Sequence, residues 1–435
     1  MEIFSRIGRQ QESNNIFYYD EVCNAAKYLI GQVKDTGYIS ASSTYFFYTP
    51  HWFRDSSHIA IALDDFADFF KHANPELSEA AANAANRINT FNLRAIEYYT
   101  DSIKRALALK YEDKEFYMLS SHIPARINEH FGLFKGSDGK EQINDTMNDR
   151  WLVQYDTLPL VLLAIYNEQN TVGISEYEKN SIKEHAELWS SYLGKIYQTP
   201  SSDSWETPET NYIYFYNVAA IFKAKEVLKQ FASSGIANIT ADKIEQLFNE
   251  LYKNRGIIGA LKDFVKDGIV YSRRMPFKEP DTYFGVDSEE LFAFTKFGIS
   301  NKELGEGVEE KTIKKIEEEL FSNYMLPIRN LHDEYFCGGR WLLLGLEYAN
   351  YKLSRGDIDS AKKRIDYIAD NYSHSMPEQE ILAPAHPESA YGAELIRNNK
   401  GPIQKLNWSF AAFIHSAIQF NIQFRIASEK AALRM

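Results

Sequence analysis

The chain has 435 residues, of which 44% are hydrophobic and 25% are charged, as in an ordinary folded protein. Its formal charge of −12 argues against nucleic acid as the main partner, because an acidic surface repels a polyanion. The sequence contains no basic tail or stripe that would reverse this repulsion. A neutral or cationic small molecule fits the charge better.

The number of cysteines and the hydropathy of the chain indicate the cellular compartment in which we expect the protein. Two cysteines, Cys23 and Cys337, do not make a disulfide framework in a chain of this length. The first residues, Met1 to Arg6, lack the apolar run of a signal peptide. No stretch reaches the roughly 18–20 uncharged apolar residues of a membrane span. We expect reduced thiols, a cytoplasmic location unless a leader has been removed, and no membrane partner.

Apolar residues recur at helical spacing along most of the chain. The spacing predicts helices at about 19–34, 55–72, 77–109, 155–168, 175–197, 211–232, 240–265, 287–297, 309–322, 338–355, 358–372 and 407–428. The best candidate for a strand is the short segment 268–272. No low-complexity linker divides the chain. The sequence therefore predicts an all-α protein with one domain over residues 1–435.

The connections between these helices are very unequal in length. The long ones are at about 35–54, 111–153, 198–210, 266–286, 323–337 and 373–406. A closed ring of helical hairpins fits this pattern, because each helix buries one stripe against its neighbours and the long loops gather at one mouth. An α-solenoid is the alternative, although the sequence has no fixed repeat period.

Five of the six tryptophans lie in or beside the long loops, next to polar or charged residues: Trp52, Trp151, Trp205, Trp341 and Trp408. A sugar site needs this combination, because pyranose rings have apolar C–H faces and a rim of hydroxyl groups. The alternative is that each tryptophan anchors its loop to the core. All five together favour a binding mouth for an oligosaccharide.

Cleavage of a glycosidic bond needs two carboxyl groups, one on either side of the bond. Glu206 follows Trp205, and an aromatic neighbour promotes the protonated form that an acid needs. Taken alone, Glu206 is equally a first-turn residue that stabilises a helix dipole. Glu378, taken alone, is an ordinary loop carboxylate. The chain has 60 acidic residues, so composition cannot select these two.

Six ordered blocks between about 45 and 420 resemble the glucoamylase family, glycoside hydrolase family 15. They are Tyr48-Thr49-Pro50-His51-Trp52-Phe53-Arg54-Asp55-Ser56, Trp151-Leu152-Val153-Gln154-Tyr155-Asp156, Asp203-Ser204-Trp205-Glu206, Arg329 with Asp333 and the segment from Tyr335 to Trp341, Met376-Pro377-Glu378-Gln379, and Leu406-Asn407-Trp408-Ser409-Phe410-Ala411-Ala412. Any single block is weak evidence, whereas six in the same order are strong. The resemblance implies an (α/α)6 barrel.

The resemblance also implies roles for individual residues. Glu206 matches the general acid and Glu378 the general base. Arg54 and Asp55 match the pair that binds the hydroxyl groups of the terminal glucose, and Arg329 matches a substrate-contacting arginine for which Arg340 is a rival. Ring contacts would come from Tyr48, Trp52, Trp205 and, on the tryptophan argument above, from Trp151, Trp341 and Trp408.

The activity implied is an inverting, exo-acting α-glucosidase that releases β-glucose from α-1,4- or α-1,6-linked gluco-oligosaccharides. Inversion requires carboxyl groups about 6.5–9.5 Å apart, against roughly 5 Å in retaining enzymes. Thr207 departs from the family, which often has a second glutamate there, so the leaving-group subsite is open. A trehalase-type hydrolase and a non-catalytic glycan-binding barrel are the alternatives.

Histidine spacing indicates no metal site, because the ten histidines form no His-Glu-x-x-His or similar pattern. We therefore expect neither a metal nor a cofactor.

Overall fold

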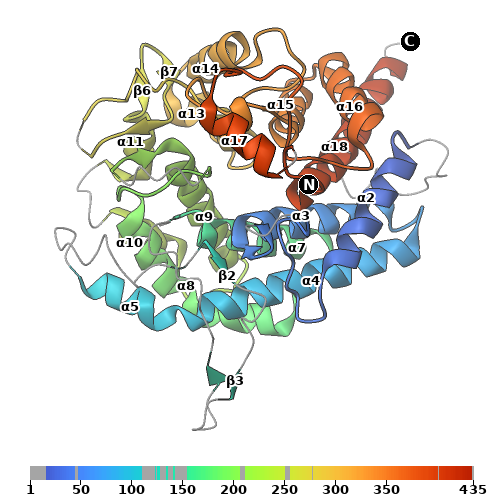
Figure 1. The fold of residues 1–435 in the computed structure, drawn as a ribbon. Coiled ribbons are helices and arrows are strands. Elements are labelled where there is room, and N and C mark those ends of the chain that lie inside the picture. The colour runs from blue at the N-terminus through green and yellow to red at the C-terminus, as the bar shows by residue number, and fades with distance from the viewer. Residues whose placement is uncertain are drawn as a thin grey trace.

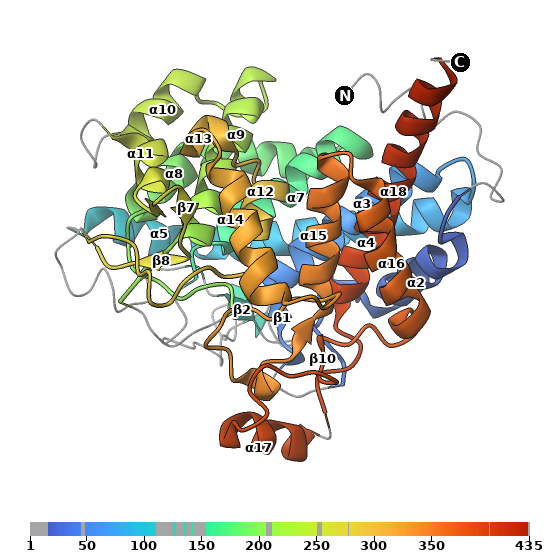
Figure 2. The same cartoon turned by 90° about the horizontal axis from the view of Figure 1, so that it is seen from above.

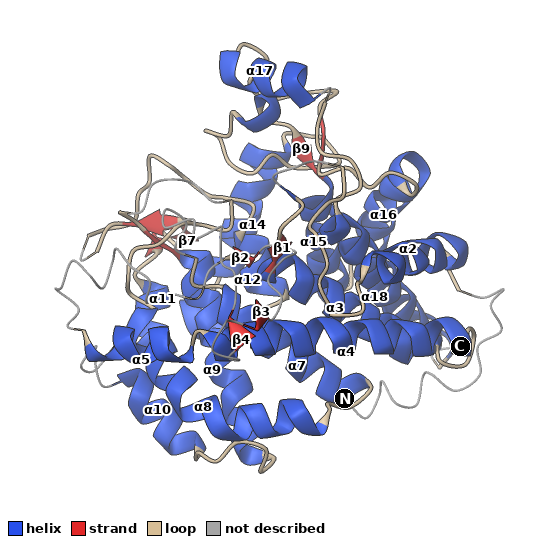
Figure 3. Cartoon of the chain, turned by 60° about the horizontal axis from the view of Figure 1, so that its bottom comes forward, coloured by secondary structure: helices blue, strands red, loops and turns tan. Residues whose placement is uncertain are grey.

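The computed structural model describes residues 16–44, 48–109, 123, 125–127, 134–135, 141–142, 154–205, 211–249, 255–276, 278–399 and 401–433. Most of these residues are helical, and the strands among them are two residues long and paired two by two (Figures 1 and 3). The all-α prediction is confirmed.

Six helices form a closed inner ring: α3 (Phe53–Phe70), α7 (Thr157–Thr171), α9 (Phe215–Ser233), α12 (Glu290–Thr295), α15 (Leu342–Ser354) and α18 (Asn407–Ala432). Each contacts the next in chain order, and α18 returns to contact α3. Helix α3 is buried at nearly every position, including its charged first turn. A helix that is covered on all sides in this way belongs inside a second layer.

The outer layer alternates with the inner ring along the chain. It consists of α2 (Tyr19–Gln32), α4 (Pro75–Tyr98), α8 (Glu176–Ile196), α10 (Ala241–Asn249) with α11 (Gly256–Lys262), α14 (Val308–Ile316) and α16 (Ile358–Tyr372). These helices bury one face and expose the other, as α16 does with Ala361, Ile365, Ile368 and Ala369. Inner and outer helices together make the (α/α)6 barrel, so the fold prediction is confirmed.

Several predicted helix boundaries differ from those in the structure. The predicted helix 77–109 is broken at Tyr99 into α4 and α5 (Thr100–Ala108), and α4 begins at Pro75, earlier than predicted, with Asn74 as its cap. Asp357 caps α16, where its side chain accepts from the N–H of Ser360. Helices α13 (Asn301–Leu304) and α17 (Ala390–Asn399) were not predicted. Helix α17 buries only Gly392 and therefore has no apolar stripe to recognise.

Short strands tie the long loops to the N-terminal ends of the inner helices. Strands β1 (His51–Trp52), β5 (Ile213–Tyr214) and β9 (Arg340–Trp341) each run directly into an inner helix. Their partners are β2 (Arg126–Ile127), β8 (Arg273–Arg274) and β10 (Gln379–Glu380). Figure 2 shows β1, β2, β10 and α17 at the same end of the molecule. The N-terminal ends of these inner helices and the long loops therefore lie at the same end of the barrel.

Cys23 and Cys337 are both buried and form no disulfide. None of the helices in the described part of the chain combines the length and the apolar character that crossing a membrane would require.

Candidate active site

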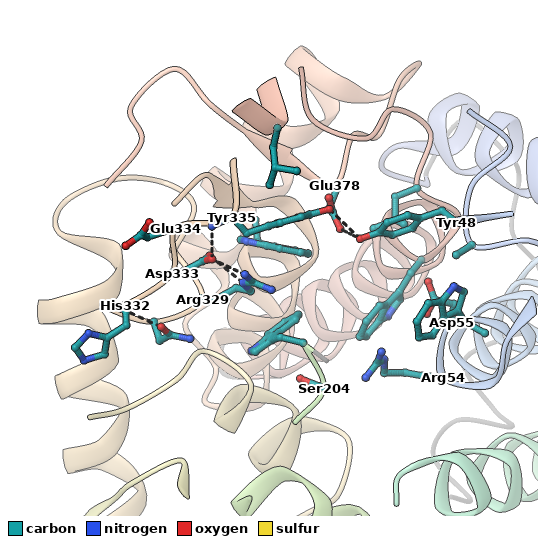
Figure 4. A pocket seen from close by; sticks show the side chains of 18 of the residues that line it. Tyr48, Arg54, Asp55, Ser204, Arg329, His332, Asp333, Glu334, Tyr335 and Glu378 are labelled. Carbon is teal, nitrogen blue, oxygen red and sulfur yellow. Dashed lines mark hydrogen bonds and ion pairs between the residues drawn. The ribbon is translucent and has the colours of Figure 1, made fainter. Parts of the chain in front are cut away.

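A cavity of about 950 Å³ opens at the loop end of the barrel (Figure 4). Each of the six predicted long loops contributes to its wall. Its lining includes Ala41, Tyr48, Trp52, Arg54, Asp55, Arg126, Ser204, Trp205, Arg273, Tyr283, Phe284, Arg329, Asn330, His332, Asp333, Glu334, Tyr335, Trp341, Glu378, Tyr391, Leu395, Leu406 and Trp408. Its size is that of a pocket for a small organic ligand.

The structure brings together nine of the eleven predicted site residues. Eight predicted binding residues and Glu378 line this one cavity: Tyr48, Trp52, Arg54, Asp55, Trp205, Arg329, Trp341 and Trp408. Glu206 and Trp151 lie outside the described residues. The separation of the two carboxyl groups therefore stays a prediction.

Glu378 is held between the two helices that close the ring. Its backbone N–H donates to the carbonyl of Ile403 over 2.8 Å, and its own carbonyl accepts from the N–H of Leu342 at the start of α15. The carbonyl of Pro377, one residue earlier, accepts from Oγ of Ser409 in the first turn of α18 over 3.2 Å. The position of the carboxyl group is thus fixed by the barrel.

The Glu378 carboxyl group is 1% exposed, and burial raises its pKa to about 7. The Tyr48 hydroxyl, which donates to Oε1 over 2.6 Å, and the positive charge of Arg329 both oppose that rise by stabilising the carboxylate. Oε2 has no hydrogen-bond partner within the described residues. One oxygen is therefore oriented by Tyr48, and the other is left for a water or a ligand.

Arg54 and Asp55 lie in the first turn of α3, at the buried end of the cavity. The Arg54 guanidinium donates to Oδ2 of Asp156 over 3.4 Å and lies 5.7 Å from the ring centroid of Trp408. Burial raises the pKa of Asp55 to about 6, although the neighbouring Arg54 lowers it. A guanidinium and a carboxylate side by side offer donors and acceptors that match sugar hydroxyl groups.

Arg329 occupies the middle of the wall and is surrounded by rings. It forms a two-pronged ion pair with Asp333, with Nε donating to Oδ2 over 2.8 Å. Its guanidinium carbon lies 5.1–5.5 Å from the ring centroids of Trp205, Tyr335 and Trp341. Burial lowers the pKa of Arg329, but the opposite charge of Asp333 and its hydrogen bonds outweigh this, so the pKa is raised and the side chain stays a cation.

Arg340, the rival to Arg329, does not line the cavity. Its guanidinium donates to the carbonyls of Ala383 and Leu326 and lies over the ring of Tyr324. Arg340 therefore joins two loops, and of the two rivals only Arg329 lines the cavity.

Buried carboxyl groups at the start of α12 anchor the segment that precedes Glu206. Oδ1 of Asp287 accepts from Trp205 Nε1 over 2.8 Å, and Oδ2 of Asp287 accepts from Asn330 over 2.7 Å. Oε2 of Glu289 accepts from Oγ of Ser204 over 2.6 Å. Burial raises the pKa of Asp287 to about 7 and that of Glu289 well above its ordinary value.

Sequence reasoning missed Asp287, Glu289 and Asn330. The run from Asp287 to Glu290 has the appearance of an acidic first helical turn, although α12 begins only at Glu290, with Glu289 as its N-cap. Tyr335 and Asp333 lay inside a recognised block, yet neither was assigned a role. The described residues contain no group of three or more His, Cys, Asp or Glu side chains arranged to hold a metal ion.

No protein-family model matches the chain, and no curated protein sequence is similar to it. Solved structures are similar. A glycosidase is 17% identical with a TM-score of 0.71, over 92% of this chain and 97% of that one, and a variant of a glycosidase solved in complex with glucose gives the same values. The glucoamylase of Saccharomycopsis fibuligera is 15% identical with a TM-score of 0.56, over 93% and 95% of the two chains.

This chain has a glucoamylase-like fold. The glucoamylase of Hormoconis resinae agrees, at 15% identity and a TM-score of 0.54, over 94% of this chain and 74% of that one. At these identities the likeness concerns the fold, and the chemistry has to be argued from the cavity.

Proposed function

We propose that the chain is a glycoside hydrolase, and specifically an inverting, exo-acting α-glucosidase that releases β-glucose from the non-reducing end of α-1,4- or α-1,6-linked gluco-oligosaccharides. Its general acid is Glu206 and its general base is Glu378. The observation that carries the proposal is the cavity itself, in which a buried carboxyl group, an arginine–carboxylate pair and four tryptophans from distant loops meet. Neutral sugar rings need this mixture of apolar rings and hydroxyl partners.

The reaction is a single displacement. Protonated Glu206 gives its proton to the glycosidic oxygen as the bond to the anomeric carbon breaks. Ionised Glu378 takes a proton from a water molecule, whose oxygen forms the new bond to the anomeric carbon from the opposite face. Glucose leaves with inverted configuration, and the two carboxyl groups exchange protonation states and are restored through solvent.

The environment of Glu378 suits a base. A pKa of about 7 leaves a substantial ionised fraction at neutral pH and a strong affinity for the proton of water. Its Oε2, which has no hydrogen-bond partner in the part of the chain that the structure describes, is the atom that can accept this proton. Arg54 and Asp55, 4% and 6% exposed, would bind the terminal sugar at the closed end of the cavity, which accounts for attack on chain ends.

The test is incubation with maltose, isomaltose, trehalose and maltodextrin while NMR follows the anomer of glucose as it appears. β-Glucose from maltose or isomaltose supports the proposal, and α-glucose contradicts the inverting mechanism. Turnover of trehalose alone would identify a trehalase, and the absence of turnover on every sugar would favour a binding protein.

Two variants test the assigned roles. Glu206→Gln and Glu378→Gln each remove one ionisable group with little change of shape, and we expect both to lose turnover by several orders of magnitude while the circular dichroism spectrum is unchanged. Glu380→Gln is the matched control for the base, because Glu380 lies two residues away and its carboxylate accepts from Tyr367 and Tyr372 rather than lining the cavity. An active Glu206→Gln enzyme would mean that another residue is the acid.

A further inference from the structure

We propose that the open end of the cavity carries a separate platform, formed by Tyr283, Phe284 and His332, which binds sugar rings beyond the first leaving-group ring of a gluco-oligosaccharide. This inference rests on the proposed function and adds to it a preference for substrates of three or more rings.

The cavity has a buried end and an open end. Arg54 and Asp55 are almost fully buried, whereas Tyr283, which lines the same cavity, is 84% exposed. Figure 4 shows His332 at the side opposite Arg54 and Asp55, with Arg329 and Asp333 between them. If the terminal glucose lies at Arg54 and the first leaving-group ring near Arg329, later rings reach the residues around His332.

The platform is a set of stacked rings. The His332 ring centroid lies 5.3 Å from that of Tyr283 and 5.6 Å from that of Phe284, with interplanar angles of 29° and 27°. His332 Nε2 is also 3.2 Å from the carbonyl oxygen of Tyr283. The Arg273 guanidinium covers Phe284 at 3.9 Å. These contacts leave most of the Tyr283 ring uncovered.

The loop that carries Tyr283 is fixed by charges. The Phe284 N–H donates to Oδ1 of Asp281 over 3.2 Å, and Oδ2 of Asp281 accepts from Nε of Arg273 over 3.0 Å. Arg273 in turn belongs to β8, which pairs with the strand that leads into α9. The backbone that carries the exposed ring is therefore tied to the barrel, so a bound ligand has little more than the Tyr283 side chain to order.

Helix α17 also contributes apolar side chains to the wall of the cavity. Tyr391 and Leu395 lie four residues apart on α17 and both line the cavity, with Tyr391 55% exposed. Helix α17 is anchored because Oγ of Ser389 donates to Glu334 over 2.7 Å and Gly392 packs so closely on the Cys337 backbone that a Cβ atom would be 2.2 Å from its nitrogen. The loop of Tyr283 and helix α17 thus both present apolar area to the cavity.

The ligand class follows from the chemistry of this end. Uncovered aromatic faces match the C–H faces of pyranose rings, and the hydroxyl of Tyr283 can exchange hydrogen bonds with sugar hydroxyl groups. The same end carries both Arg273 and Glu334, so it has no single charge to select an ionic ligand. A neutral oligosaccharide fits better than a charged aglycone.

The test compares chain lengths. We expect Tyr283→Ala to lower kcat/KM roughly three- to tenfold on maltotetraose and isomaltotetraose, the range that aromatic stacking provides, and to leave maltose and isomaltose unchanged. Tyr98→Ala is the control, because Tyr98 is 48% exposed on α4 and does not line the cavity. An equal loss on disaccharides and tetrasaccharides, or a loss confined to 4-nitrophenyl α-glucoside, would overturn the platform.

A binding measurement separates this proposal from the activity. In a Glu378→Gln background, calorimetry should give a tetrasaccharide affinity that Tyr283→Ala weakens three- to tenfold, while the affinity for glucose stays the same. Equal tetrasaccharide affinities with and without Tyr283 overturn the platform, whether or not the parent protein hydrolyses any glucoside. Absence of turnover in the parent protein, by contrast, contradicts the proposed function alone.

Discussion

The hydroxyl of Tyr48 donates a hydrogen bond to Oε1 of Glu378 over 2.6 Å, joining two loops that are 330 residues apart in the chain. The same hydroxyl lies 3.2 Å from that of Tyr335. Because Glu378 is buried, its pKa depends on how many such donors stabilise the carboxylate. The hydrogen bond from Tyr48 therefore helps to set the pH at which the proposed base, Glu378, is ionised.

Tyr48→Phe should shift the pH profile. Loss of the donor raises the pKa of Glu378 above about 7, so the acid limb of kcat/KM moves to higher pH, by about one unit if the bond contributes the usual energy for a charged acceptor. At pH 6 we expect roughly a tenfold loss, and a smaller one at pH 8. Tyr367→Phe is the control, because it removes an equally short bond to Glu380, which does not line the cavity. An unchanged limb would show that Tyr48 does not control the titration.

Asp287 should prove to be a positioning residue. Its carboxyl group accepts from Trp205 Nε1 and from Asn330, and Trp205 immediately precedes Glu206 in the chain. Asp287→Leu removes both acceptors, and we expect kcat to fall roughly 10- to 100-fold, the scale of a displaced catalytic group. Asp287→Asn keeps an oxygen for Trp205 and should retain most of the activity.

Steady-state kinetics on both variants provide the measurement. Equal kcat values for Asp287→Leu and the parent enzyme would refute the positioning role, provided that circular dichroism shows both proteins folded.

The barrel could be predicted from the sequence because the pattern that produces it, apolar residues at helical spacing, lies within short stretches of the chain. Apolar spacing and the unequal loops predicted both the helical rings and the end at which the loops meet. The break between α4 and α5 at Tyr99 and the position of α17 could not be predicted, because no apolar stripe in the sequence marks either one. In α17 a single buried glycine packed on Cys337 replaces the usual hydrophobic face.

The candidate site could be predicted only where ordered blocks selected its residues. Arg54 and Glu378 are one arginine and one glutamate among many, and only their neighbours in the sequence distinguished them. Asp287 and Glu289 act through contacts with Trp205 and Ser204 that are more than eighty residues away in sequence. Such contacts leave no local pattern, and an acidic first turn is the ordinary interpretation of that segment.

Arg329→Lys should separate the two arginines that the sequence left as rivals. A lysine cannot reproduce the two-pronged pair with Asp333 or the contacts of a guanidinium with the three surrounding rings, so we expect kcat/KM to fall roughly 10- to 100-fold. Arg340→Lys removes bonds to backbone carbonyls instead, and should lower the melting temperature while KM is unchanged. Kinetics and thermal melts on both variants test this, and a larger kinetic loss in Arg340→Lys would reverse the assignment.

Asp64 should destabilise the barrel at high pH. It lies on α3 with no exposed surface, and neither carboxyl oxygen has a hydrogen-bond partner within the described residues. Burial, and then the charges of Glu168, Asp65 and Glu178, raise its pKa well above the ordinary value. A raised pKa in the folded state means that folding takes up a proton, so stability is lost as the pH rises above the pKa of the unfolded chain. Glu168, with a pKa of about 7, adds to the same slope.

Asp64→Asn keeps the shape and removes the titration. We expect its free energy of unfolding in urea to exceed that of the parent protein by about 1–3 kcal/mol at pH 8, and by less at pH 5, where the unfolded Asp64 is closer to its own pKa. Asp68→Asn is the matched control on the same helix, because Asp68 is 42% exposed and pairs with Lys71 at the surface. A variant that is no more stable than the parent at pH 8 would mean that the buried carboxyl group has a compensating partner.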